Sequence, residues 1–279
     1  MTGKAFRPRR HELGRLRWLA FGLLVVYFVL TVVLPVLVLF WASLLPFFAA
    51  PSAEALRRVS AANYLALLDL PSFHRALINS LVLAIASASA VTLLTALIAW
   101  IVYKSRLRGA WLLDFLAFLP IAVPGLVLGM ALIWFYVAFP LPICGTIWVL
   151  LVAYATKYLP FGMRAASGSM VQVHRELEEA GSAAGGSWWQ VFRRVTLPLL
   201  RPGLAAGWIY ICIISFREFS TSVLLVTGQS TVLSILIFSL FEQGQPTLVA
   251  AIGMVMIAVL ATVVLAFYKL SGRIGIQAS

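Results

Sequence analysis

Long runs of apolar residues, each followed by a short polar or basic segment, restrict most strongly how this chain can fold. An apolar helix of about 20 residues matches the thickness of the hydrocarbon core of a bilayer. Of the 279 residues, 62% are hydrophobic and 11% are charged, whereas a soluble domain has about 25% charged residues. Lipid cannot satisfy backbone polar groups, so runs of this length favour helices. We therefore expect an all-α polytopic membrane protein.

Six segments are expected to be transmembrane helices. They cover residues 18–45, 79–103, 112–138, 143–163, 204–226 and 247–270. The preceding tail, residues 1–17, is strongly basic, and basic segments are retained in the cytoplasm. An even number of spans then places both termini there, including residues 271–279, and leaves residues 18–270 as one membrane domain with a cytoplasmic loop at 164–203.

The formal net charge of +12 could indicate a nucleic-acid partner. However, the basic residues are dispersed between the apolar runs, and cytoplasmic loops of membrane proteins carry such an excess. We therefore expect membrane lipid and no nucleic acid as a partner. The two cysteines, Cys144 and Cys212, have neither a metal-site spacing nor a disulfide framework, and no metal site is expected.

The third apolar run contains a cluster of helix-breaking residues. Pro120 and Pro124 lie inside it, next to Gly125 and Gly129. A break at membrane depth is tolerated only where the freed backbone is buried in protein or lines a cavity. The two glycines also permit a close helix crossing, and we favour packing over a pore-lining role.

Two charged residues lie inside the fifth run, at Arg217 and Glu218. A charge at the centre of a membrane helix costs roughly 2.5–3.5 kcal/mol on insertion scales, so such residues usually face a protein interior or a water-filled path. Ser220 and Thr221 follow and make the stretch more polar. We expect these four residues to line a translocation path, and the alternative is an anchoring pair near the outer mouth.

The longest polar interruption runs from Arg175 to Pro202. It opens with three carboxylates, Glu176, Glu178 and Glu179, and continues through a run of small residues into a basic segment. Because small residues permit a tight turn, two short helices joined at Gly185 and Gly186 are predicted outside the bilayer. A charged connector between membrane helices is usually only a solvated loop. A further role for this segment therefore depends on whether its residue order matches a known motif.

That order resembles the EAA signature of permease subunits of binding-protein-dependent ABC importers, the type I or MetI-like class. The family pattern is Glu-Ala-Ala, three residues, Gly, nine residues and Ile-x-Leu-Pro, and its spacing is matched throughout. Gly181 replaces the second Ala and Val195 replaces Ile. The resemblance implies that this loop docks on a separate ATPase as a coupling helix. The residues that it assigns to coupling are Glu176, Glu178, Glu179, Ala180, Gly181, Gly185, Leu197 and Pro198.

Three further segments resemble the ferric-iron branch of these permeases. They contain Leu119-Pro120 with Val123-Pro124-Gly125, then Phe216 to Ser220, and Val232 to Ser234. Permeases of that branch are often double-length chains, and this sequence is similar to the C-terminal half of one. The resemblance implies iron(III) as the solute, with phosphonate, polyamine, sulfate and thiamine as alternatives. It also implies two ATPase subunits, a second permease half, a periplasmic binding protein and a location in the bacterial inner membrane.

Sequence signatures of enzymes are absent from the chain. It has no Walker A sequence, no HExxH and no G-x-S-x-G. We therefore expect no catalytic residue and no bound cofactor, with ATP and Mg²⁺ used by the partner ATPase. An ion-coupled secondary transporter and a membrane-embedded enzyme are the rival classes, and neither would need the EAA loop.

Overall fold

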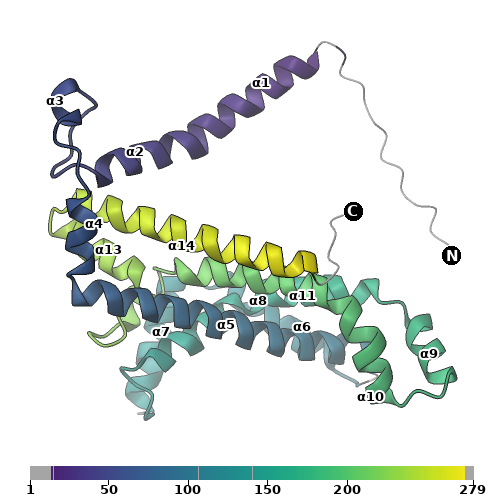
Figure 1. Ribbon diagram of the computed structural model, residues 1–279. Coiled ribbons are helices and arrows are strands. Elements are labelled where there is room, and N and C mark those ends of the chain that lie inside the picture. The colour runs from purple at the N-terminus through teal and green to yellow at the C-terminus, as the bar shows by residue number, and fades with distance from the viewer. Residues whose placement is uncertain (1–13, 15, 106, 140, 274–279) are drawn as a thin grey trace.

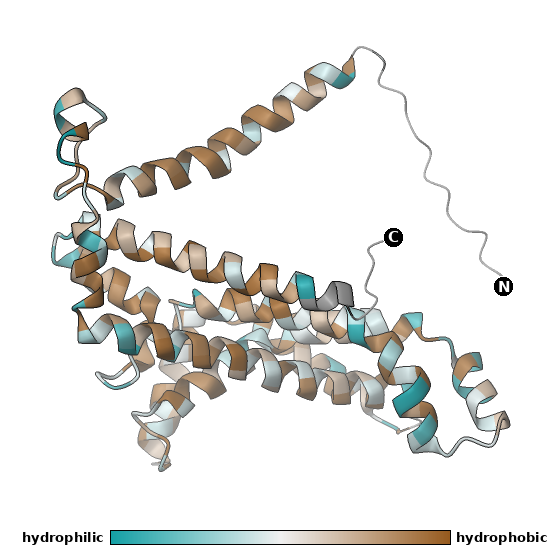
Figure 2. Ribbon diagram, viewed as in Figure 1, coloured by the Kyte–Doolittle hydropathy of each residue, from teal (hydrophilic) through white to brown (hydrophobic). Residues whose placement is uncertain are grey.

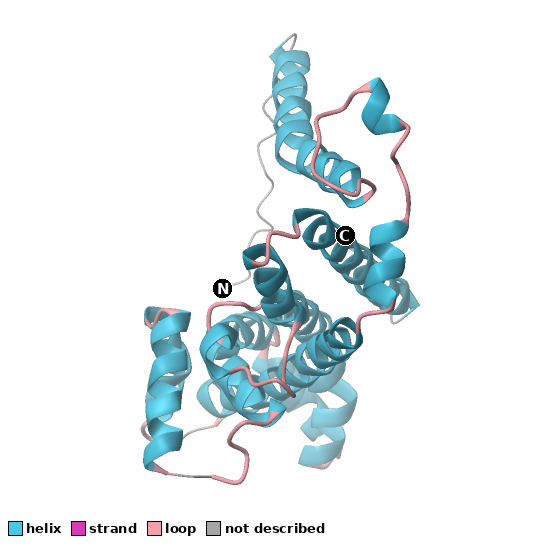
Figure 3. Ribbon diagram, turned by 90° about the vertical axis from the view of Figure 1, so that its left-hand side faces the viewer, coloured by secondary structure: helices cyan, strands magenta, loops and turns pink. Residues whose placement is uncertain are grey.

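Helices make up all the regular structure in the part of the chain described by the computed structural model, which is residue 14 and residues 16–105, 107–139 and 141–273 (Figure 3). No strand occurs among these residues, so the expected all-α class is confirmed. Most of the predicted basic tail, 1–17, and residues 274–279 of the predicted C-terminal tail lie outside the described residues.

Three helices form the centre of the bundle: α5 (Pro71–Lys104), α8 (Ile147–Gln172) and α11 (Leu197–Phe216) (Figure 1). The buried face of α5 consists largely of Ala, Ser, Val and Thr. Small residues also bring α8 and α11 together, because a Cβ atom on Gly207 would lie 2.6 Å from the Cβ of Ala165. Gly203 likewise faces Ser169 of α8, so the two glycines allow α8 and α11 to cross closely.

The first apolar run extends away from this bundle. Helix α1 (Leu16–Phe28), the π-helical turn η1 (Val29–Val33) and α2 (Leu34–Ser43) follow one another without interruption. Helix α2 packs against α14 (Pro246–Arg273), whereas α1 buries none of its residues (Figure 1). Pro35 is the second residue of α2, just after this π turn, and the helix continues without a break.

Short helices lie between the long ones. These are α3 (Ala53–Leu56), α4 (Ala62–Leu68), α12 (Ser222–Leu225) and α13 (Leu233–Glu242). In helix α4, the Asn63 side chain donates to the backbone oxygens of Ser43 and Leu45 at 2.9 and 2.8 Å, which ties α4 to the end of α2. Helix α13 is apolar but too short to count among the candidate membrane spans.

The third apolar run is broken at the predicted place. It forms α6 (Ala110–Phe118), a 3-10 turn η2 (Leu119–Ala122) and α7 (Gly125–Ala138), and the two halves are bent by 108°. Pro124 immediately precedes α7, as expected of a residue that cannot continue a helix. The run is therefore a sharply bent pair of half-helices in place of one straight span.

Four helices among the described residues are long and apolar enough to cross a membrane: Leu16–Ser43, Pro71–Lys104, Trp188–Phe216 and Pro246–Lys269. The bent pair makes a fifth if it counts as one span. Brown, hydrophobic helices dominate Figure 2, as a multi-pass membrane protein requires. The fourth predicted span, 143–163, falls on α8, which continues to Gln172. The six-span count and the cytoplasmic termini remain predictions.

The expected fifth span, 204–226, is not one helix. Helix α11 ends at Phe216, and a non-helical segment follows before α12 begins at Ser222. The prediction that Arg217 and Glu218 occupy adjacent positions within a helix is therefore wrong. The physical reason is a set of tertiary polar contacts to this segment, described below.

Candidate functional site

The predicted coupling segment forms an elbow of two helical arms at one end of the bundle (Figure 1). Its first arm is α9 (Arg175–Ala183), and the second is α10 (Trp188–Val191), followed directly by the π turn η3 (Phe192–Thr196) and α11. Gly185 lies between them with φ +83°, a conformation in which residues with a Cβ are strained. The predicted helix–turn–helix at Gly185 and Gly186 is thus observed.

Close packing inside the elbow accounts for its small residues. A Cβ atom on Gly181 would lie 3.1 Å from the Cγ2 atom of Val191, and the backbone N–H of Gly186 donates to the oxygen of Gly181 at 3.2 Å. Ser187 and Gln190 form a reciprocal capping box at the start of α10. The Gly181 departure from the EAA pattern therefore lets the two arms approach.

The three predicted carboxylates of α9 differ in their surroundings. Glu176 and Glu179 are exposed, as is Ala180. The Glu178 carboxylate instead turns toward the bundle, where Lys104 Nζ lies 3.1 Å from Oε2 and Thr196 Oγ1 donates to Oε1 at 2.9 Å. Leu197 and Pro198 form the first turn of α11, which continues directly from η3.

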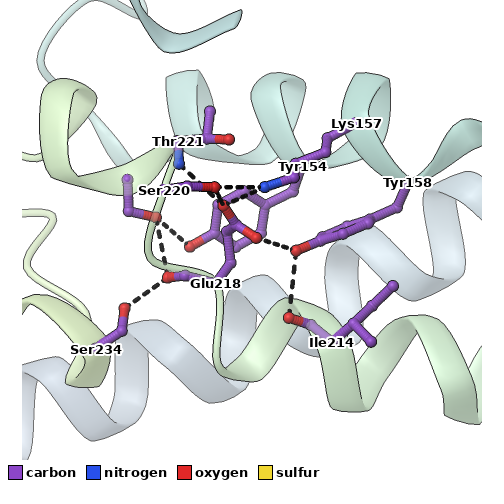
Figure 4. Close-up of polar contacts among 9 residues, drawn as sticks. Tyr154, Lys157, Tyr158, Ile214, Glu218, Ser220, Thr221 and Ser234 are labelled. Carbon is purple, nitrogen blue, oxygen red and sulfur yellow. Dashed lines mark hydrogen bonds and ion pairs between the residues drawn. The ribbon is translucent and has the colours of Figure 1, made fainter. Parts of the chain in front are cut away.

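A second polar centre lies at the break between α11 and α12 (Figure 4). The Glu218 side chain is 7% exposed, and its Oε1 atom lies 2.6 Å from Lys157 Nζ of α8. Tyr158 donates to Oε2, while the Ser220 hydroxyl and the Thr221 backbone N–H both donate to Oε1 at 2.9 Å. The carboxylate is thus neutralised by a cation and also hydrogen-bonded by three groups.

The backbone around Glu218 is held as well. Ser234 of α13 and Ser222 of α12 donate to the Glu218 carbonyl oxygen at 2.5 and 3.3 Å. Ser222 in turn pairs with the hydroxyl of Tyr154 on α8 at 2.6 Å. These contacts come from three different helices, so the non-helical segment is fixed by the bundle around it (Figure 4).

The depth of this centre follows from a contact between central helices. Ser87, halfway along α5, donates to Ser215 at 2.9 Å, and Ser215 lies in the last turn of α11. Arg217 and Glu218 therefore lie near the middle of the bundle. Arg217 is exposed in the single chain, in contrast to Glu218, and lines an apolar groove beside Phe219 and Phe238.

Of the four predicted path residues, the structure brings Glu218, Ser220 and Thr221 into one cluster and leaves Arg217 outside it. Sequence reasoning missed Lys157, the cation of that cluster. The available signal was a single lysine within an otherwise apolar run, because an ionisable residue at membrane depth marks a candidate functional site. Among the described residues, no group of three or more His, Cys, Asp or Glu side chains is placed to hold a metal ion.

Known proteins resemble this chain in sequence. The family model described as binding-protein-dependent transport system inner membrane component matches residues 92–273. A ferric transport permease, FbpB of Actinobacillus pleuropneumoniae, is 31% identical over 68% of this chain. The sulfate permease CysT of Escherichia coli strain K12 is 30% identical over 64% of it, and a putative 2-aminoethylphosphonate permease, PhnV of Salmonella paratyphi A, is 27% identical over 58%.

The lengths of these relatives differ from that of this chain. The chain spans 28% of the FbpB sequence, against 69% of CysT and 62% of PhnV. The resemblance to the ferric relatives is therefore a resemblance to part of a much longer protein.

The fold also matches solved structures. A bacterial alginate ABC transporter, in complex with an alginate pentasaccharide-bound periplasmic protein, has a chain with a TM-score of 0.72 at 18% identity, and the match covers 95% of this chain and 98% of that one. For the MetNI methionine ABC transporter in an inward-facing conformation the TM-score is 0.63 at 16% identity, covering 76% and 97%. These likenesses establish a shared fold. The family model, which matches well over half of the residues, establishes the sequence relationship, and the chain belongs to the family of binding-protein-dependent transport system inner membrane components.

Proposed function

We propose that this chain is one permease half of an ATP-driven ABC importer in the bacterial inner membrane. Two ATPase subunits bind at the elbow, a second permease half completes the solute path, and a periplasmic binding protein delivers the solute. The observation that carries the proposal is the elbow of α9 and α10, whose sequence matches the EAA pattern and which protrudes from the bundle (Figures 1 and 2).

The connection between the elbow and the bundle supports this role. The second arm continues through η3 into α11 as one helical segment, Trp188–Phe216, of 29 residues. At 1.5 Å per residue such a segment is about 40 Å long. It ends next to Arg217 and Glu218, near the middle of the bundle. A displacement of the elbow would therefore be passed along this helix to the non-helical segment that contains Arg217 and Glu218.

For the cargo we propose iron(III), on the support of the ferric relatives. An anionic solute, such as sulfate or 2-aminoethylphosphonate, is the second candidate. It is favoured by a specific observation: Arg217 is exposed, whereas the neighbouring Glu218 carboxylate is buried and paired with Lys157. A surface with this charge attracts an anion more readily than a bare trivalent cation.

Affinity purification of the tagged chain from native membranes tests the transporter class. We expect an ABC ATPase and a second permease chain to co-purify. In reconstituted vesicles, uptake should stop when ATP is omitted and should continue when an ionophore collapses the ion gradients. Uptake with the opposite dependence would identify a secondary transporter and contradict the proposal.

The cargo is tested separately, in cells that lack or express the chain. Uptake of ⁵⁵Fe(III), of ³⁵S-sulfate and of labelled 2-aminoethylphosphonate is compared in the two strains. We expect only the iron uptake to depend on the chain. Dependence of one of the two anions instead would favour the second candidate, without affecting the assignment as a permease.

A further inference from the structure

Glu178 is partly buried, whereas Glu176 and Glu179 are exposed, and its carboxylate contacts the end of α5 and the turn η3. Its side chain is 23% exposed, and that of its partner Lys104 is 12% exposed. Lys104 also donates to the backbone oxygen of Val173 at 2.9 Å, which fixes its position beside the start of the elbow. Thr196, the second partner, is 2% exposed. One carboxylate thus links α9 to the last residue of α5 and to the last residue of η3.

Few apolar contacts hold α9 against the bundle. None of its described residues is buried, and its close packing is with Val191, inside the elbow itself. A cavity of about 720 Å³ lies between the elbow and the ends of α5 and α8, and Trp100, Lys104 and Glu178 are among the residues that line it. The polar contacts of Glu178 therefore bridge a region where apolar packing is sparse.

We propose that Glu178 is a positioning residue that transmits the movement of α9 to the bundle, through Lys104 to α5 and through Thr196 to α11. It acts inside the permease, while the exposed face of α9 remains for the ATPase. Helices α5 and α11 pack against each other and against α8. Tying α9 to both of them makes the elbow move together with the central helices.

This inference rests on the proposed function, since it concerns how ATPase movement is transmitted. It is tested in the purified complex of permease and co-purifying ATPase. Spin labels are placed at Ala183→Cys in α9 and Leu97→Cys in α5, two exposed positions, in a chain whose native cysteines are changed to alanine. Pulsed electron–electron double resonance spectroscopy measures the distance between the two spin labels, first without nucleotide and then after trapping with ATP and vanadate.

With Glu178 intact we expect the same distance distribution in both states, because α9 and α5 move as one body. In Glu178→Gln the distribution should differ between the states, because α9 follows the ATPase while α5 stays behind. The ATPase should still co-purify in the same amount. ATP-driven uptake per ATP hydrolysed should fall about fivefold, the size of a typical coupling effect.

The charge-reversed pair separates transmission from a general loss of structure. Lys104→Glu and Glu178→Lys should each show the state-dependent distance, and the double variant should regain a constant one. Glu54→Gln, which breaks the exposed ion pair with Arg58 at the other end of the molecule, is the matched control and should behave as wild type.

The outcomes distinguish this inference from the proposed function. If no ATPase co-purifies with the wild-type chain, the proposed function fails and the inference fails with it. If the wild-type complex transports but Glu178→Gln keeps a constant distance and normal uptake, only the inference is overturned. If Glu178→Gln loses the ATPase, Glu178 is a docking contact and not a transmitting one.

Discussion

Lys157 Nζ lies 2.6 Å from Glu218 Oε1, and this pair joins α8 to the non-helical segment that separates α11 from α12. Sixty-one residues separate the two along the chain. The pair is the electrostatic centre of the interior, because Ser220 donates to the same carboxylate oxygen and also accepts from Lys157 at 2.7 Å. Removing Lys157 leaves the buried Glu218 carboxylate without a cation, and removing Glu218 leaves the partly buried Lys157 ammonium without its anion.

Lys157→Met should destabilise the chain strongly. The Glu218 carboxylate would keep its burial and lose its cation, and breaking a buried pair in this way costs about 3–5 kcal/mol. We expect a clear drop in the thermal unfolding midpoint of the detergent-solubilised protein, measured with a thiol-independent dye or by light scattering.

Adding Glu218→Gln to Lys157→Met provides the control for that prediction. The double variant has no unpaired charge. Its unfolding midpoint should therefore fall by less than the sum of the decreases in Lys157→Met alone and Glu218→Gln alone, since the effects of interacting residues do not add. Strict additivity of the two losses would show that the pair does not act as a unit.

Gly125→Ala should be destabilising although it adds one methyl group. The new Cβ would lie 2.2 Å from Ser220 Oγ and 2.7 Å from Lys157 Nζ, so these two of the four partners of the Glu218 carboxylate would be displaced. Overpacking of this kind typically costs about 1–3 kcal/mol. Gly168→Ala in α8 is the matched control, because no atom lies within 4 Å of its added Cβ. Equal unfolding midpoints for the two variants would contradict the predicted contact.

Local sequence signals predicted the elbow, whereas they did not predict the break at Glu218. The turn at Gly185 and Gly186 depends on the backbone freedom of the two glycines themselves and not on residues distant in the sequence. The segment after Phe216, by contrast, lies inside the stretch that was expected to form one helix, and its departure from a helix depends on partners in α8 and α13. Those partners are distant in sequence and invisible to periodicity.

The carboxylates of the elbow illustrate the same limit. Their presence on a short helix before the Gly185 turn follows from the sequence. The inward direction of Glu178 does not, because it is set by Lys104, 74 residues earlier. The direction in which a polar side chain of a helix turns can be predicted only where the residues packed around that helix are also known.

The turn at Gly185 should tolerate asparagine and reject valine. Its φ of +83° costs most residues about 1–2 kcal/mol, while asparagine adopts this region more readily. No atom lies within 4 Å of a Cβ added there, so the strain is in the backbone and not in packing. We expect Gly185→Val to reduce the amount of co-purifying ATPase while the chain still inserts into the membrane, and Gly185→Asn to retain most of it. Equal ATPase recovery from both variants would show that this conformation does not set the docking geometry.

Arg217 should determine which charge the path accepts. It is exposed near the middle of the bundle, where contact with lipid would be costly, so its guanidinium faces protein or water. At contact distance and an effective dielectric constant of about 20, one charge is worth up to about 4 kcal/mol. If the cargo is an anion, Arg217→Gln should lower kcat/KM for uptake at least about tenfold, which corresponds to roughly 1.4 kcal/mol. Arg217→Lys, which keeps the charge, should retain most of the uptake.

If the cargo crosses as free iron(III), removal of the positive charge should leave ⁵⁵Fe uptake equal to wild type or faster. Uptake of every solute at the same reduced rate in both variants would indicate that Arg217 holds the second permease half and does not meet the solute.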